Sequence, residues 1–83
     1  MVINEDRTVL VTYDRSVDAA FIYLVGEIRP GQVKKTFPCD PTEMNGQINL
    51  DFDEAGQLLG IEVLDASRML PKSVLENAGE LDL

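Results

Sequence analysis

Residues 48–64, with the sequence INLDFDEAGQLLGIEVL, decide the fold of this chain. Apolar and polar side chains alternate from Ile48 to Phe52, which is the pattern of a β-strand with one buried face. The following Asp53-Glu54-Ala55-Gly56 predicts a tight turn, because its glycine adopts a positive φ at no steric cost. A second apolar strand then runs from about Gln57 to Leu64. The stretch therefore predicts an antiparallel hairpin.

Two registers are open for this hairpin. A four-residue loop pairs Leu50 with Leu59, whereas a three-residue loop with a bulge at Gly56 pairs Phe52 with Leu58. The first register places one apolar face on both strands, and the second shifts the pairing by one residue. The sequence does not decide between them.

Three further strands are expected before the hairpin. Thr8–Tyr13 is a short β-prone run, and Ala20–Val25 is apolar at every position, which predicts a strand covered on both faces. Val33–Phe37 contains two lysines, which suit an exposed sheet edge. The sequence therefore predicts four to five strands in all.

The C-terminal part of the chain predicts one short helix. Pro71 suits the first turn of a helix, apolar residues recur at helical spacing after it, and Gly79 is a suitable stop. Asp65 or Ser67 is expected to cap a single turn before this helix. The expected fold class is α+β, a small antiparallel β-meander sheet of four to five strands with one short C-terminal helix packed on one face. It forms a single domain over residues 1–83.

Composition excludes several classes of partner. Fifteen acidic and seven basic residues give a net charge of −8, with no histidine. Nucleic acids and anionic membranes are not expected partners, because binding phosphates requires clustered Lys and Arg, and Lys34-Lys35 is the only adjacent basic pair. Without histidine, no metal or other cofactor is expected. One cysteine, Cys39, together with the lack of a signal-like or membrane-spanning stretch, predicts a cytoplasmic protein.

An ordered set of short motifs resembles a known family. The set comprises Tyr13-Asp14, Asp18-Ala19-Ala20, Asp53-x-x-Gly56 and residues 60–67 (GIEVLDAS). Over about Tyr13–Leu75 the chain resembles the bacterial domain of unknown function family numbered 2283. The resemblance implies a small sheet-plus-helix fold in the bacterial cytosol and no established catalytic residue. It also implies toxin-like proteins as neighbours, and hence an antitoxin-like role as the acidic partner of a basic protein.

One motif has the spacing of a calcium-binding loop. In Asp51-x-Asp53-x-x-Gly56-x-x-x-x-x-Glu62, carboxylates occupy loop positions one, three and twelve. Ala55 supplies no side-chain oxygen at position five. An extended hairpin would also hold Glu62 about 20 Å from the turn, at about 3.3 Å per residue. We therefore expect a solvated turn here and no metal site.

A second carboxylate set combines Asp14, Asp18, Glu62 and Asp65. Carboxylates from different strand ends can meet to form a divalent-metal site or an acid/base pair. The structural interpretation is that Asp14 and Asp18 bond turn amides while Asp65 caps the helix. We favour the structural interpretation.

Two functional hypotheses follow. The favoured one is a non-catalytic protein-interaction module, either a homodimer that pairs sheet edges or buries a second sheet face, or an acidic partner of a basic protein. A strand that is apolar on both faces needs a partner where one helix covers only one face, so Ile22, Tyr23 and Leu24 are the candidate interaction residues. The alternative is a small metal-dependent or acid/base enzyme that uses the carboxylates named above. No residue pattern specifies an activity.

Overall fold

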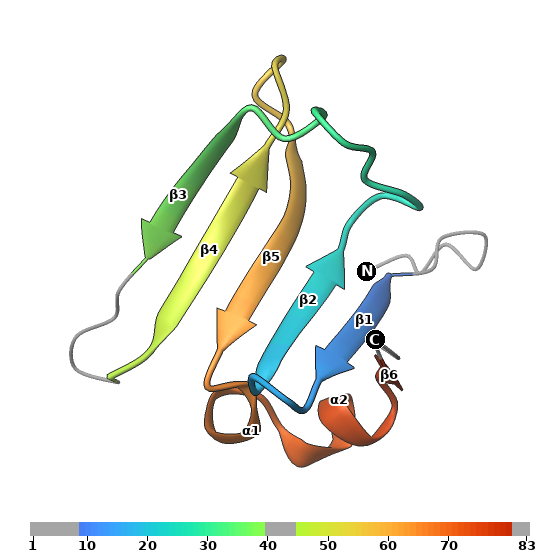
Figure 1. Cartoon of the computed structure of the whole chain (residues 1–83), viewed down its shortest axis with the longest axis vertical. Coiled ribbons are helices and arrows are strands. Elements are labelled where there is room, and N and C mark those ends of the chain that lie inside the picture. Colours follow the sequence, from blue (N-terminus) through green and yellow to red (C-terminus); the bar gives the residue numbers. More distant parts are fainter. Residues whose placement is uncertain (1–8, 40–44, 81–83) are drawn as a thin grey trace, which may run out of the picture.

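The computed structural model describes residues 9–39 and 45–80, which form one six-stranded sheet and two short helices (Figure 1). The strands are β1 (Leu10–Asp14), β2 (Ala19–Tyr23), β3 (Lys35–Cys39), β4 (Gln47–Phe52), β5 (Leu58–Leu64) and β6 (Gly79–Glu80). The helices are α1 (Ala66–Met69) and α2 (Lys72–Glu76). The strand order is β3-β4-β5-β2-β1-β6, and every pair is antiparallel except the parallel contact of β6 with β1.

The expected α+β class with an antiparallel sheet is confirmed. The meander is interrupted twice. The connection from β2 to β3 carries the chain across β5 and β4 to one edge, and the connection from β5 to β6 carries it past β2 and β1 to the other. The structure has two short helices where one was expected. Leu70 has an extended conformation (φ −106°, ψ 148°), as residues before proline prefer, and Pro71 therefore separates α1 from α2. The predicted edge strand is β3, the outermost strand of the sheet.

The β4–β5 hairpin combines the second predicted register with a bulge at an unexpected place. Phe52 pairs with Leu58, as the shorter loop predicts. The register then shifts between Asp51 and Phe52, so Leu50 pairs with Ile61 and the predicted pairing of Leu50 with Leu59 is wrong. The shift lies inside the ladder, where β5 carries one extra residue, and this is the geometry of a β-bulge.

The hairpin turn itself has the predicted chemistry. Gly56 has a φ of 83°, and its N–H donates to the Asp53 carbonyl at 3.0 Å. The Asp53 carboxylate also accepts the Gln57 N–H at 2.9 Å. Asp53 is thus engaged within its own turn.

Cross-strand register assigns side chains to the two faces of the sheet, because directly paired residues point to the same side. Face A carries mostly apolar side chains, among them Val11, Tyr13, Ala20, Ile22, Phe37, Ile48, Leu50, Ile61 and Val63. Face B carries a mixed set that includes Thr12, Phe21, Tyr23, Thr36, Asn49, Asp51 and Glu62.

The core lies on face A at the end of β5, β2 and β1. Its buried members are Ala20, Val63 and Ala66, and Met69, Leu70 and Leu75 are among the partly buried residues packed on them. Helix α1 contacts β2 and β5, while α2 contacts β1. Figure 1 shows both helices at this end of the sheet and neither over β3 or β4. The expectation of helix packing on one face therefore holds for only part of the sheet.

Candidate functional site

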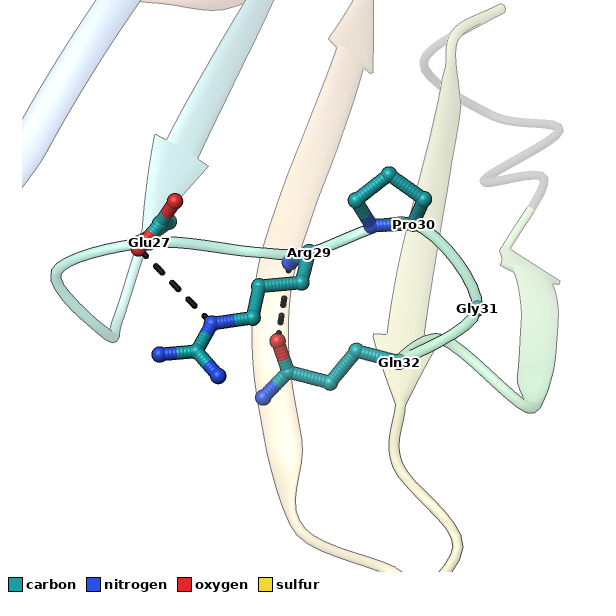
Figure 2. A pocket seen from close by; sticks show the side chains of 5 residues that line it. All are labelled: Glu27, Arg29, Pro30, Gly31 and Gln32. Carbon is teal, nitrogen blue, oxygen red and sulfur yellow. Dashed lines mark hydrogen bonds and ion pairs between the residues drawn. The ribbon is translucent and has the colours of Figure 1, made fainter.

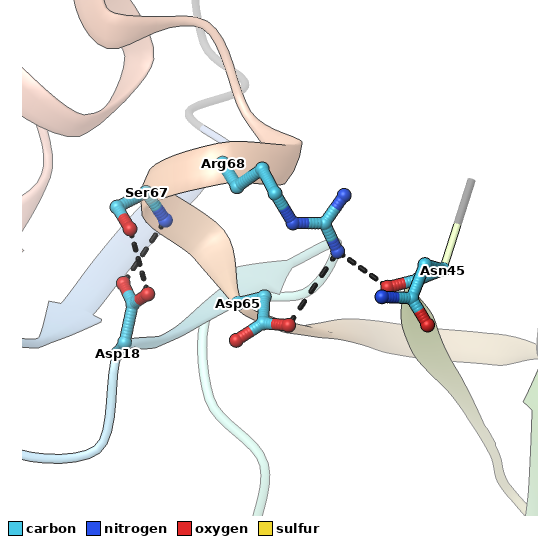
Figure 3. A network of polar contacts seen from close by, with 5 residues as sticks. All are labelled: Asp18, Asn45, Asp65, Ser67 and Arg68. Carbon is cyan, nitrogen blue, oxygen red and sulfur yellow. Dashed lines mark hydrogen bonds and ion pairs between the residues drawn. The ribbon is translucent and has the colours of Figure 1, made fainter.

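Asp18 joins the β1–β2 turn to the start of α1. Its Oδ1 accepts a hydrogen bond from the Tyr13 hydroxyl at 2.6 Å and another from the Ser67 N–H at 2.9 Å. Its Oδ2 accepts the Ser67 hydroxyl at 2.7 Å (Figure 3). The Asp18 carbonyl accepts the Ala66 N–H at 3.0 Å. We call these contacts of Tyr13, Asp18, Ala66 and Ser67 the Asp18 clamp.

The clamp replaces the helix cap that the sequence predicts. Asp65 occupies the N-cap position of α1, but its side chain makes no capping hydrogen bond, so the predicted cap is wrong. The reason is conformational, since Asp65 is left-handed (φ 53°, ψ 43°) whereas a capping residue has extended backbone angles. Asp18, which is itself left-handed at φ 52°, supplies the acceptor from 49 residues earlier in the chain.

The clamp shifts the two ionisable groups in a direction that opposes acid/base chemistry. The Tyr13 hydroxyl and then the Ser67 hydroxyl stabilise the Asp18 carboxylate, and they lower its pKa. The same bond to Asp18 raises the pKa of Tyr13 above its usual value. A general base or acid at neutral pH needs a pKa moved toward 7. Both shifts lead away from 7, which fits a structural role.

A second polar contact lies on the other side of α1. The Arg68 guanidinium donates to the Asn45 carbonyl and lies 3.4 Å from the Asp65 carboxylate (Figure 3). Asn45 is also left-handed, at φ 51°. Asn and Asp tolerate this conformation better than other residues with a side chain. Arg68 therefore ties α1 to the segment that enters β4.

The two remaining carboxylates of the candidate set lie apart from the clamp. Asp14 accepts the Ser16 N–H at 3.0 Å and the Ser16 hydroxyl at 2.6 Å, which is the predicted bond to a turn amide. Glu62 accepts the Asn49 amide at 2.8 Å across β4 and β5 on face B. Within residues 9–39 and 45–80, no three His, Cys, Asp or Glu side chains are placed to hold a metal ion together.

The three candidate interaction residues do not share one surface. Ile22 lies on face A and packs against the core, while Tyr23 lies on face B and makes an edge contact with Phe21 at 4.6 Å between ring centres. Leu24 follows β2, and 40% of its surface is exposed. Consecutive strand residues point to opposite faces. A strand that is apolar at every position therefore contributes apolar side chains to both faces of the sheet.

An open hollow of about 550 Å³ lies in the β2–β3 connection. Figure 2 shows its lining residues Glu27, Arg29, Pro30, Gly31 and Gln32. The Arg29 guanidinium lies 3.8 Å from the Glu27 carboxylate, and the Arg29 N–H donates to the Gln32 side chain at 2.9 Å. The polar groups here satisfy one another, so the hollow presents no convergent set for a ligand.

A smaller, more apolar hollow lies on β3 and the β4–β5 turn. It measures about 300 Å³ and is lined by Lys35, Phe37, Phe52, Asp53, Glu54 and Gly56. The rings of Phe37 and Phe52 meet edge to face at 5.6 Å, and 51% of Phe37 is exposed. We call this region the Phe37–Phe52 surface. The sequence pattern did not indicate this surface, although an aromatic residue, Phe37, in a predicted edge strand was a usable signal.

The family model for a protein of unknown function (DUF2283) matches residues 10–67, which are 58 of the 83 residues. The chain belongs to this family. The DUF2283 match begins with β1 and ends at Ser67, so it includes every residue of the Asp18 clamp and excludes α2 and β6. No curated protein and no solved structure gives a significant match to the chain.

The DUF2283 match adds no activity to the site, because the family has no assigned function. Neither of the helices that the structure describes has the length and apolar character needed to cross a membrane.

Proposed function

We propose that this DUF2283 protein is a non-catalytic protein-interaction module and that its binding surface is the β3–β4 part of face A. The observation that carries the proposal is the exposure of Phe37, an aromatic side chain with 51% of its surface open beside a hollow of about 300 Å³. Phe52 and Leu50 lie next to it on the same face. Exposed aromatic side chains beside a hollow are typical of protein-binding surfaces.

The edges of the sheet are less suited to binding than its face. Pro38 in β3 has no N–H to donate, and Lys34 and Lys35 begin this edge, both of which are devices that discourage strand addition. At the other side, β6 pairs with β1 through Thr12 and Tyr13. Of the two modes of association considered from the sequence, burial of a face is therefore favoured over edge pairing.

The enzyme hypothesis has no support in the geometry. Asp14 bonds its own turn, Asp18 is held by Tyr13 and Ser67, and Glu62 bonds Asn49 on face B. These groups are engaged in hydrogen bonds that stabilise turns and strands. We regard the carboxylates as structural.

The net charge of −8 is a second feature that would affect binding, through electrostatic attraction of a protein partner. A basic protein would be attracted to such a chain, and the attraction would fall as salt screens it. We further propose a cytoplasmic location, which the single, exposed and unpaired Cys39 supports.

Capture from a lysate of the source cells tests the binding surface. Tagged wild-type chain is compared with Phe37→Asp and with Val17→Asp, a matched control that adds the same charge at an apolar side chain 66% exposed in the β1–β2 turn. We expect Phe37→Asp to lose proteins that wild type and Val17→Asp retain. Equal capture by all three would contradict the proposed surface. A high-salt wash identifies partners held by charge.

A further inference from the structure

Building on the proposed function, we infer that the occupant of the Phe37–Phe52 surface is a second copy of this chain, packed face to face about a two-fold axis. Two features of the described residues support this occupant: the size of the core and the placement of charge around the surface.

The core of one copy is small. Its strongly buried apolar residues are Ala20, Leu59, Val63 and Ala66, and two of these are alanines. No large side chain in the described part of the chain is fully buried. Domains of this size fold on a core alone only with difficulty, and oligomerisation is a common remedy. A second copy is always present at the same concentration as the first. One contact between two copies covers the Phe37–Phe52 surface of each.

Charge around the surface is self-complementary. In a two-fold contact the same patch appears on both sides, so it must carry both members of each complementary pair. Lys35, Asp53 and Glu54 all line the hollow, and Lys35 pairs across the strands with Phe52, the residue before Asp53. The proposed two-fold axis brings the lysine of each copy toward the acidic turn of the other. The apolar rings then fill the centre of the contact, and the charges form its rim.

Lys35 gives this acidic chain a basic group that a second copy can contact at this surface. A chain with a net charge of −8 repels its own copies over most of its surface, so self-contact is helped where a basic residue is available. Lys35 lines this surface, and Lys34 precedes it in the chain. Among the described residues neither lysine side chain has an ion-pair partner.

Sedimentation of the purified full chain over a wide concentration range tests the inference. We expect a species of twice the 9.2 kDa chain mass at micromolar concentration. Phe37→Asp should weaken association by about 30-fold or more, as expected for a central aromatic residue of an interface. Val17→Asp should associate like wild type. Circular dichroism of each variant checks that the sheet is retained.

A charge exchange tests the two-fold arrangement independently of folding. Lys35→Glu and Glu54→Lys should each weaken the dimer, because each places like charges across the axis. The double variant Lys35→Glu/Glu54→Lys restores opposite charges and should recover most of the affinity. Weakening in both single variants without recovery in the double variant would overturn the arrangement.

The outcomes separate this inference from the proposed function. Wild-type chain that stays monomeric at all concentrations overturns the second-copy inference. If Phe37-dependent capture from lysate persists in that case, the interaction surface stands with a different occupant. A dimer that Phe37→Asp leaves intact overturns the inference, and it counts against the proposed surface when lysate capture is also unchanged.

Discussion

The two halves of the sheet differ in how backbone pairing relates to side-chain burial. Among the described residues, the four strongly buried apolar side chains belong to β2, β5 and α1, in the half of the sheet that the helices contact, which we call the covered half. Ala20, Val63 and Ala66 form one cluster, whereas Leu59 lies near the opposite end of β5. Strands β3 and β4 pair over five residues, but no side chain in either strand is buried. A hydrogen-bond ladder thus continues across the whole sheet, whereas a core exists under only half of it. Because ladders alone contribute little net stability, the second half depends on what covers it.

The largest expected loss comes from the covered half. Leu59→Ala removes a side chain that is 2% exposed, and we expect it to lower the free energy of unfolding by about 2–5 kcal/mol. Urea denaturation measures the loss. Leu24→Ala is a matched control, because its N–H bonds the Leu59 carbonyl at 2.9 Å but its side chain is 40% exposed. We expect the control to change stability by about 0.5 kcal/mol at most. Equal losses of stability in Leu59→Ala and Leu24→Ala would contradict the idea that side-chain burial determines the loss.

Close packing on face B of the covered half gives the second prediction. A Cβ at Gly60 would lie 2.5 Å from the Phe21 ring and 3.1 Å from the Ile22 carbonyl oxygen. We expect Gly60→Ala to cost about 1–3 kcal/mol by thermal or urea unfolding, because the aromatic ring must move. Adding Phe21→Leu should recover part of this loss.

Gly26 supplies the control for this experiment. A Cβ there meets nothing within 4 Å, so Gly26→Ala should be close to neutral. A Gly60→Ala protein as stable as the Gly26→Ala protein would contradict the prediction. It would show that the Phe21 ring moves aside without loss of stability.

The Asp18 clamp, which holds α1 on the covered half, predicts a pH-dependent effect. The clamp lowers the pKa of Asp18 from its ordinary 3.8, so its contribution to stability is complete above that value and is lost as the pH falls through the lower folded-state pKa. Tyr13→Phe removes the largest cause of the shift. We expect it to lower the urea midpoint at neutral pH and to match wild type once the carboxylate is protonated.

This titration has an outcome that would contradict the prediction, and it extends to alkaline pH. A constant difference between Tyr13→Phe and wild type at every acidic pH would contradict a role for the carboxylate. At alkaline pH the direction of the pH dependence is opposite. The pKa of Tyr13 is raised in the folded state, so its contribution to stability is complete below pH 10.0 and is lost as the pH rises through the folded-state pKa.

The smallest effect is expected in the uncovered half. The Thr36 hydroxyl donates to the Asp51 carboxylate at 2.7 Å on face B, in an exposed cross-strand pair. Thr36→Val keeps the β-branched shape and should cost about 0.2–1 kcal/mol. Asp51→Ala should cost a similar amount, and the double variant little more than either single variant, because both remove one interaction. Additive losses would mean that the bond contributes nothing.

Much of the fold was predictable, because strand and turn signals are local. The alternation from Ile48 to Phe52, the Asp53 turn and the break at Pro71 all appear where the sequence indicates them. The two lysines of the Val33–Phe37 run correctly indicated an edge strand. Each signal involves side chains within a few residues of one another, where steric and periodic rules apply directly.

The features that escaped prediction are long-range. Periodicity does not state which strand β2 will pair with, so the placement of β5 beside it was not readable. The bulge at Leu59 depends on packing across the ladder, and β6 has only two residues. The clamp between Asp18 and Ser67 spans 49 residues, and the sequence offered two nearer capping candidates. The Phe37–Phe52 surface could not be predicted, because its exposure depends on how much of the sheet the helices cover.

The Asp18 clamp also has a consequence for folding kinetics. Helix α1 has four residues, too few to persist alone, and its acceptor becomes available only when β5 pairs with β2 and brings Leu64 beside Ala19. We therefore expect the clamp to close late, after strand pairing has brought these distant segments together at a cost in loop-closure entropy. Contacts made after the transition state govern the unfolding rate and leave the folding rate nearly unchanged. We therefore expect loss of the clamp to raise the unfolding rate and to leave the folding rate nearly unchanged.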